Sequence, residues 1–167
     1  MNSDELKALQ APLKSQYRET PDAARRTMSV TGQVNVESLI CRLETAAGPV
    51  DSGLHPAAGG SGDDACSGDM LLEALIACAG VTFSAVATAM SVPITSASIT
   101  AEGVIDFRGT LGVSKDVPIG FESIKLTFNV ESDAPRDKVE KLVELAERYC
   151  VILQSLQNPP AIETVLA

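Results

Sequence analysis

One apolar segment dominates the pattern of hydrophobic and polar positions: GDMLLEALIACAGVTFSAVATAMS, residues 68–91. A helix of about 22 residues within this segment spans about 33 Å, and Pro93 marks its end. About 20 apolar residues can also cross a membrane. However, Glu73 lies within the segment, small residues dilute its hydropathy and no positive cluster flanks it. The pattern therefore favours the central helix of a soluble core.

Alternation with a period of two predicts strands on both sides of this helix. Before it, apolar and small residues alternate with polar ones over residues 27–36 and 39–43. After it, strands are predicted over 99–107 and 121–130, with a glycine-rich turn at 108–113 between them. Residues 161–167 are predicted as a last strand.

Two further helices are amphipathic. Residues 3–18 carry leucines on one side and are followed by the breaking pair Thr20-Pro21. The second helix is predicted to begin near Pro135, and its apolar stripe comprises Val139, Leu142, Val143, Ala146, Cys150 and Leu153. The order of elements indicates an α+β fold with antiparallel sheet. We divide it into an N-terminal helical extension, residues 1–26, and one domain, residues 27–167.

The central helix needs cover on nearly every side because it is apolar on nearly every side. One sheet and one amphipathic helix cannot enclose about 33 Å of it. The sequence therefore predicts an intimate homodimer.

The composition and charge of the chain disfavour some classes of binding partner. The chain has 167 residues, 45% of them hydrophobic, and a formal net charge of −9. This charge disfavours nucleic acid and anionic membranes, which attract clustered Lys and Arg. The first residues, MNSDELK, carry acid where a signal peptide is basic. We predict a cytoplasmic protein whose cysteines are reduced.

The cysteines and the single histidine do not follow a metal-binding motif. A zinc site of Cys66, Cys78, Cys150 and His55 is conceivable, but no pair has C-x-x-C spacing. We predict no metal and no cofactor. Cys66 lies in the glycine-rich loop 53–69. Two interpretations of it are open: a third redox partner, or a small residue that packs against the start of the helix. His55 precedes a proline, which is typical of a turn residue. The alternative is that its side chain donates a hydrogen bond to a substrate.

Cys78 and Cys150 lie on the apolar sides of the two long helices. Small residues surround Cys78 on its helix face, so another element can approach closely. Buried cysteines are often only small core residues, and Cys41 is interpreted in this way because it points as Leu39 and Leu43 do. The alternative for Cys78 and Cys150 is that they too are only small core residues.

The runs ACSGDMLLEALIACAGVT and ERYCVILQSL resemble the two cysteine-bearing helices of the OsmC/Ohr family, the osmotically inducible and organic-hydroperoxide-resistance proteins. The segments LHPAAGGSGDDACSGDMLLEAL and DFRGTLGVSKDVPIGF are similar to an OsmC-like subgroup whose members mostly lack an assigned substrate. The resemblance covers residues 27–167. It implies antiparallel sheets around two long helices in an intertwined homodimer, with two active sites at the subunit interface.

The resemblance also implies an activity, that of a cysteine-based organic hydroperoxide reductase. Cys78 would attack a hydroperoxide as a thiolate, become a sulfenic acid and condense with Cys150, and a lipoyl or other dithiol reductant would reopen the disulfide. An apolar wall around Cys78 would favour organic hydroperoxides. The alternative is a non-catalytic protein that binds an apolar or acyl ligand at the dimer interface.

The sequence departs from the family in the groups expected to activate the thiol. The family's arginine from the first hairpin is absent from TGQVNV, and its glutamate before the helix is replaced by Gly68-Asp69. We predict that Asp69 supplies the acid, although a first-turn helix acid explains it equally well. Arg42 and Arg148 are predicted to point away from the site. The remaining candidates for a cation near Cys78 are Arg18, Arg25, Arg26 and Arg108.

Overall fold

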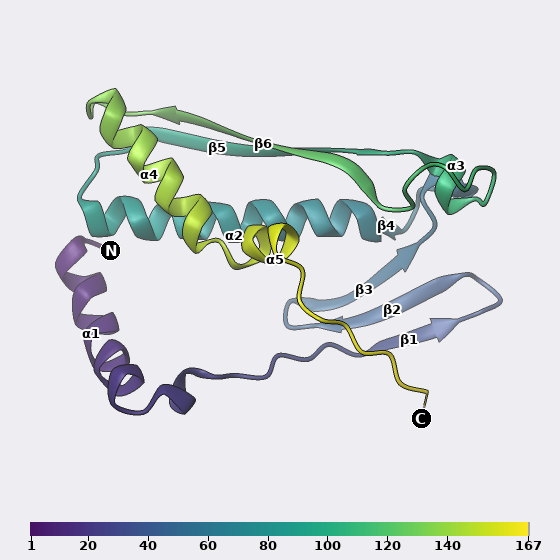
Figure 1. The fold of residues 1–167 in the computed structure, drawn as a ribbon, viewed down its shortest axis with the longest axis horizontal. Helices are drawn as coiled ribbons and strands as arrows, with labels where there is room; N and C mark the ends of the chain where they lie inside the picture. The colour runs from purple at the N-terminus through teal and green to yellow at the C-terminus, as the bar shows by residue number, and fades with distance from the viewer. Residues whose placement is uncertain (167) are drawn as a thin grey trace. The chain divides into compact units, whose positions relative to one another are not determined.

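A computed structural model describes residues 1–166 (Figure 1). Its helices are α1 (Ser3–Glu19), α2 (Ser67–Met90), α3 (Phe107–Thr110), α4 (Arg136–Tyr149) and α5 (Val151–Gln157), with short 3-10 helices η1 (Pro21–Ala24) and η2 (Pro56–Ala58). Its strands are β1 (Gly32–Asn35), β2 (Ile40–Thr45), β3 (Gly48–Gly53), β4 (Ala65–Cys66), β5 (Ser96–Ile105) and β6 (Phe121–Glu131). The fold is therefore a mixed α+β fold, as predicted.

The chain forms two compact units. The first comprises Met1–Thr20, Ala74–Thr100 and the chain from Leu126 onward, and the second comprises Pro21–Glu73 and Ala101–Lys125. Three elements, α2, β5 and β6, contribute residues to both.

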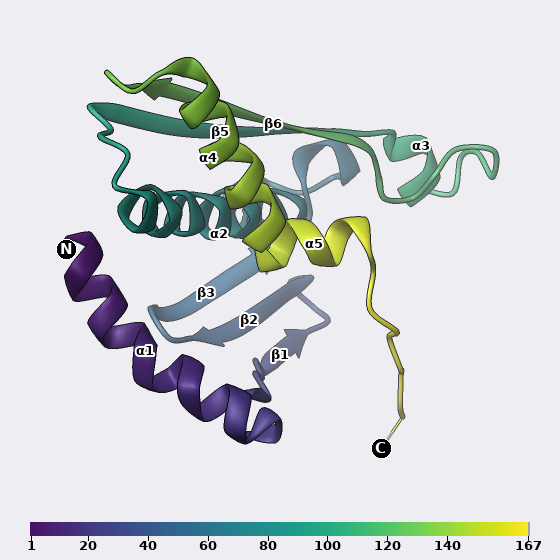
Figure 2. The ribbon, with the colours of Figure 1, turned by 60° about the vertical axis from the view of Figure 1, so that its left-hand side comes forward.

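The core of the first unit forms around one stripe of α2. Leu75, Ala79, Phe83 and Ala87 are buried at intervals of four residues, which places them on one face of the helix. Two of them pack with Leu142 and Ala146 of α4, and Val92 after α2 completes the cluster. Partly buried residues of β6 close it from the hairpin side, and the Phe83 and Phe128 rings lie 5.8 Å apart. Figure 2 shows α4 beside α2 and the paired strands β5 and β6.

The second unit contains a four-stranded sheet in the order β1-β2-β3-β4. β1 pairs with β2 and β2 with β3 in antiparallel register, with Val34 opposite Cys41 and Cys41 opposite Ser52. Cys41 is half-buried on β2, on the same side as Leu43 as predicted, whereas Leu39 lies in the turn before β2 and is 61% exposed. β4 joins β3 in parallel, with Gly53 opposite Cys66, so the sheet is not wholly antiparallel.

The helices predicted over residues 3–18 and 68–91 are both present, whereas the strand predicted over residues 27–36 covers only Gly32–Asn35. α1 begins at a capping box in which the Asn2 side chain accepts from the Glu5 N–H at 2.9 Å and Glu5 accepts from the Asn2 N–H at 2.9 Å. α2 begins at Ser67 and runs for 24 residues. By length and composition alone it could cross a membrane, a test that the core helix of a soluble protein also passes.

Shorter features differ from the predictions. Residues 161–166, predicted as a last strand, have no regular structure, and residue 167 lies outside the described residues. The predicted turn at 108–113 begins as the short helix α3, which Asp106 caps by accepting from the Arg108 N–H at 2.9 Å. Cys66 does not lie in an irregular loop, because it is the second residue of β4.

The helix predicted to run through Cys150 is also interrupted. α4 ends at Tyr149, and α5 begins at Val151. Cys150 between them has φ −74° and ψ 107°, whereas a helical residue has ψ near −42°. The interruption changes which backbone groups are available around this cysteine.

Replacing Leu142, which is fully buried between α2 and α4, should expose the dependence of the fold on this core. We expect Leu142→Ala to lower the free energy of unfolding by about 2–5 kcal/mol, through lost burial and a residual cavity. Urea unfolding at a fixed protein concentration measures the change. Leu9→Ala on the exposed side of α1 is the control, and an equal loss in both variants would contradict this core.

Candidate thiol site at Cys78 and Cys150

Cys78 lies in the middle of α2 and is half-buried. Ala74 and Thr82, four residues before and after, share its side of the helix. Small neighbours on this side leave room for another backbone to approach the sulfur, as the sequence indicated.

Cys150 is fully buried at the corner between α4 and α5. Its backbone N–H donates to the Glu147 carbonyl at 3.3 Å, and its carbonyl accepts from the Gln154 N–H at 2.9 Å. Its Sγ accepts from the Leu153 N–H at 3.5 Å, so the thiol itself caps α5. The cysteine therefore ends one helix and begins the next.

The first residues of a helix have backbone N–H groups without an intrahelical partner. In α5 these groups belong to Val151 and Ile152, and both lower the pKa of the Cys78 thiol. The Cys150 thiol and the Thr82 hydroxyl lower the same pKa. Figures 1 and 2 both show α4 turning into α5 alongside α2.

These contacts change the acidity of the two thiols in opposite directions. Burial raises the pKa of Cys78, but the Ile152 N–H, the Cys150 thiol, the Val151 N–H and the Thr82 hydroxyl together bring it below its ordinary value. Burial raises the pKa of Cys150, and the negative charge on Cys78 raises it further, against the opposing Leu153 N–H. Of the two thiols, Cys78 is therefore the one whose ionisation its surroundings favour.

A family model described as OsmC-like protein matches residues 60–165, more than half of the chain. The chain belongs to the OsmC-like family. The resemblance of its two cysteine-bearing segments to OsmC/Ohr proteins is thus confirmed.

Solved structures have the same fold at low sequence identity. The OsmC-like protein from Mycoplasma pneumoniae matches with a TM-score of 0.66 and 16% identity, over 80% of this chain and 89% of that one. An organic hydroperoxide resistance protein OsmC from Legionella pneumophila matches at 0.62 and 16%, over 80% and 92%. OhrB of Bacillus subtilis matches at 0.53 and 20%, over 80% and 93%. A search of curated proteins found no match.

The arginines of this OsmC-like chain have partners of their own in several cases. Arg42 pairs with Asp51 across the sheet at 3.1 Å. Arg108 pairs with Asp106 through two nitrogens. Arg148 lies over the Tyr149 ring, 5.6 Å from its centroid. The groups that lower the pKa of Cys78 are instead neutral donors, and most of them come from the corner at Cys150.

Asp69 occupies the first turn of α2 and is exposed. Nine residues separate it from Cys78, which corresponds to about 13.5 Å along the helix axis and to opposite faces. Its position fits the first-turn acid that the sequence offered as an alternative. A role for Asp69 toward the Cys78 sulfur stays a prediction.

The described residues contain no group of three or more His, Cys, Asp or Glu side chains that could hold a metal ion. His55 caps η2, with Nδ1 accepting from the Ala57 N–H at 3.0 Å, and its ring stacks on Phe107 at 4.9 Å. This is the turn position that the sequence indicated.

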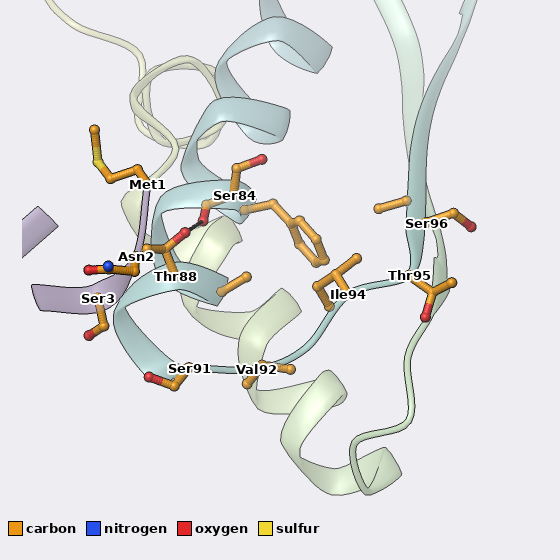
Figure 3. Close-up of a pocket in the computed structure, with 13 residues that line it drawn as sticks. Met1, Asn2, Ser3, Ser84, Thr88, Ser91, Val92, Ile94, Thr95 and Ser96 are labelled. Carbon is orange, nitrogen blue, oxygen red and sulfur yellow. Dashed lines mark hydrogen bonds between the residues drawn. The ribbon is translucent and has the colours of Figure 1, made fainter. Parts of the chain in front are cut away.

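A cavity of about 640 Å³ lies at the C-terminal end of α2, beside the first residues of α1 (Figure 3). Two of its hydroxyls are already used within the helix: Ser84 Oγ donates to the Gly80 carbonyl and Thr88 Oγ1 to the Ser84 carbonyl, each at 2.9 Å. The side chains that line it are apolar residues, hydroxyls and one amide. It therefore offers no nucleophile comparable to Cys78.

Replacing Cys150 tests how the corner activates Cys78. We expect Cys150→Ala to raise the pKa of Cys78 and to slow its alkylation at pH 7 about tenfold, because the variant loses one donor to the thiolate and the cap of α5. Alkylation rates at each cysteine can be followed against pH by peptide mass spectrometry.

Cys150→Ser is the matched control for this experiment. A hydroxyl can both donate to the Cys78 sulfur and cap α5. It should keep most of the reactivity that alanine removes. Equal Cys78 reactivity in the alanine variant and the wild-type protein would contradict the assigned contacts.

Proposed function

We propose that this OsmC-like protein is a thiol peroxidase that reduces organic hydroperoxides through Cys78. The observation that carries the proposal is the corner between α4 and α5, where the buried Cys150 thiol and the first N–H groups of α5 favour ionisation of Cys78. A thiolate is the nucleophile required for attack on a peroxide, and a neighbouring thiol supplies the proton and the second sulfur. Family members named for organic hydroperoxide resistance support the same assignment.

The reaction balances with these two groups and an external dithiol. The Cys78 thiolate attacks the terminal peroxide oxygen, the O–O bond breaks, and the leaving alkoxide takes the Cys150 proton to become an alcohol. Cys78 is then a sulfenic acid. The Cys150 thiolate attacks its sulfur, hydroxide leaves and is protonated to water, and a disulfide forms. A dithiol reductant returns both cysteines to thiols and is itself oxidised to a disulfide.

The surroundings of the pair favour a substrate with an apolar body. Val81, one turn beyond Cys78 on α2, is 73% exposed, and Tyr149 and Val151 on either side of Cys150 are 58% and 68% exposed. An alkyl or aryl hydroperoxide gains from burying such side chains, whereas hydrogen peroxide does not.

The same exposure supports a homodimer. In the most apolar part of α2 only 22% of the residues are buried. Along β1 and the chain flanking it, Met28, Val30, Val34 and Val36 are each at least 69% exposed. A second copy of the chain is the occupant that we propose for these surfaces. With a net charge of −9, we further propose a cytoplasmic enzyme without nucleic-acid or membrane partners.

Turnover of cumene hydroperoxide with dihydrolipoamide tests the activity. We expect the wild-type protein to consume peroxide and Cys78→Ser to lose at least about 1,000-fold of that rate, because an alcohol is not ionised at neutral pH. Cys150→Ser should reduce one equivalent of peroxide and stop, with a sulfenic acid at Cys78 that a dimedone adduct reveals by mass. Unchanged turnover in Cys78→Ser, or none in the wild-type protein with any organic hydroperoxide, would refute the proposal.

A charge on the exposed side of α2 tests the dimer. We expect Val81→Asp to weaken self-association at least about tenfold, since the carboxylate would lose its hydration in the interface. Sedimentation velocity over a range of concentrations measures the change. Val113→Asp is the control, because Val113 is 72% exposed in the loop after α3. A wild-type protein that stays monomeric at tens of micromolar would contradict the dimer.

A further inference from the structure

The second unit contains a separate cavity of about 330 Å³. It is enclosed by six elements of this unit: η2, β4, the first turn of α2, α3, the end of β5 and the start of β6. Figure 1 shows β4 and α3 at this end of α2. Its lining residues are His55, Cys66, Gly68, Asp69, Leu72, Gly103, Val104, Ile105, Phe107 and Phe121. Cys78 and Cys150 are not among them.

Two glycines give this cavity its shape. A Cβ atom at Gly103 would overlap the Phe121 ring, so the ring lies directly against the β5 backbone. A Cβ atom at Gly68 would lie 3.6 Å from the Cys66 Sγ, 3.6 Å from Ile105 Cδ1 and 3.7 Å from Phe121 Cζ. These are ordinary contact distances, so the missing side chain leaves room for one carbon atom in contact with all three groups.

Aromatic rings form much of the remaining wall. The His55 and Phe107 rings stack with an interplanar angle of 21°. Nδ1 of His55 accepts from the Ala57 N–H, so the proton of the neutral imidazole is on Nε2. Together with Phe121, these rings offer the π surfaces on which an aromatic group or a cation is bound.

The charge at this cavity is negative. Asp69 is the single carboxylate among the described lining residues. The nearby basic side chain, Arg108, is neutralised by its ion pair with Asp106. Asp63, Asp64 and Glu73 of the same unit add further negative charge in the chain around Asp69.

We propose that this cavity binds a small organic cation, an amine with an aromatic or branched alkyl body. The body would fill the space beside Gly68 between Phe121 and Ile105, and the ammonium group would pair with the Asp69 carboxylate at the mouth. A volume near 330 Å³ is at the lower end for small-molecule sites and matches a ligand with one ring. The proposal is independent of peroxidase activity.

Cys66 provides a direct readout because its thiol lines the cavity. We expect 2-phenylethylamine to slow alkylation of Cys66 by N-ethylmaleimide at least about fivefold at saturation, and to leave the rate at Cys41 unchanged. Peptide mass spectrometry reports both rates in the same sample. 2-Phenylethanol and 3-phenylpropionate, which have similar bodies without the cation, should need at least about tenfold higher concentrations.

Substitutions distinguish the effect of the Asp69 carboxylate on amine binding from the effect of the other negative charges nearby. Asp69→Asn should abolish the preference for the amine over the alcohol. Glu73→Gln removes the same charge one turn along α2 and should retain the preference, since Glu73 does not line the cavity. Gly68→Ala should weaken binding of all three probes, and circular dichroism checks that each variant folds.

Calorimetric titration with 2-phenylethylamine gives a second measurement that does not depend on the thiol. Binding of the amine that Asp69→Asn weakens and Glu73→Gln does not would support the proposal. Absence of both protection and heat up to the solubility limit would overturn it, as would equal affinity for the amine, the alcohol and the carboxylate.

Discussion

The candidate site depends on one interaction, between the sulfur of Cys78 and the free backbone N–H groups at the start of α5. A thiol in the middle of a long apolar helix is normally harder to ionise, because burial disfavours the charged form. The dipole of its own helix gives little help so far from the ends. The interruption at Cys150 solves this problem by placing the beginning of a second helix, with its unpaired donors, against the sulfur. It also keeps the Cys150 thiol within hydrogen-bonding reach, so the same corner supplies both the activating groups and the second sulfur.

Much of the fold follows from periodicity, and the activating groups do not. The long runs that form α2 and β6 were predictable because a repeated pattern over ten or more residues leaves few alternatives. The stripe through Val139, Leu142 and Ala146 equally predicted α4, but its continuation to Cys150 and Leu153 concealed a single non-helical residue. Only the β-branched pair Val151-Ile152, weak in helix propensity, hinted at the corner. A sequence pattern reports which side chains face the core and is silent on which backbone N–H groups lack partners. The expectation of an arginine near Cys78 came from the cost of burying a thiolate and from the resemblance to the OsmC/Ohr family.

Two short segments, β4 and residues 161–166, also show that local sequence pattern alone does not decide whether a strand forms. β4 consists of Ala65 and Cys66 alone, too short for any alternation to be recognised, and it pairs in parallel with a strand twelve residues earlier. Residues 161–166 alternate well enough to suggest a strand but have no regular structure. Pairing partners decide both cases, and a partner remote in sequence, or in a second copy of the chain, cannot be deduced from local pattern.

We infer that Cys78 loses its proton before Cys150 because of the α5 amides. Carbon-13 NMR of cysteine labelled at Cβ tests it directly, since the chemical shift of each Cβ follows the ionisation of its own sulfur and assigns the two coupled steps. We expect the pKa of Cys78 to lie below its ordinary value and that of Cys150 to lie above it, so that Cys78 titrates first. Titration of Cys150 before Cys78, or of both at the ordinary value, would contradict the activation of Cys78 by α5.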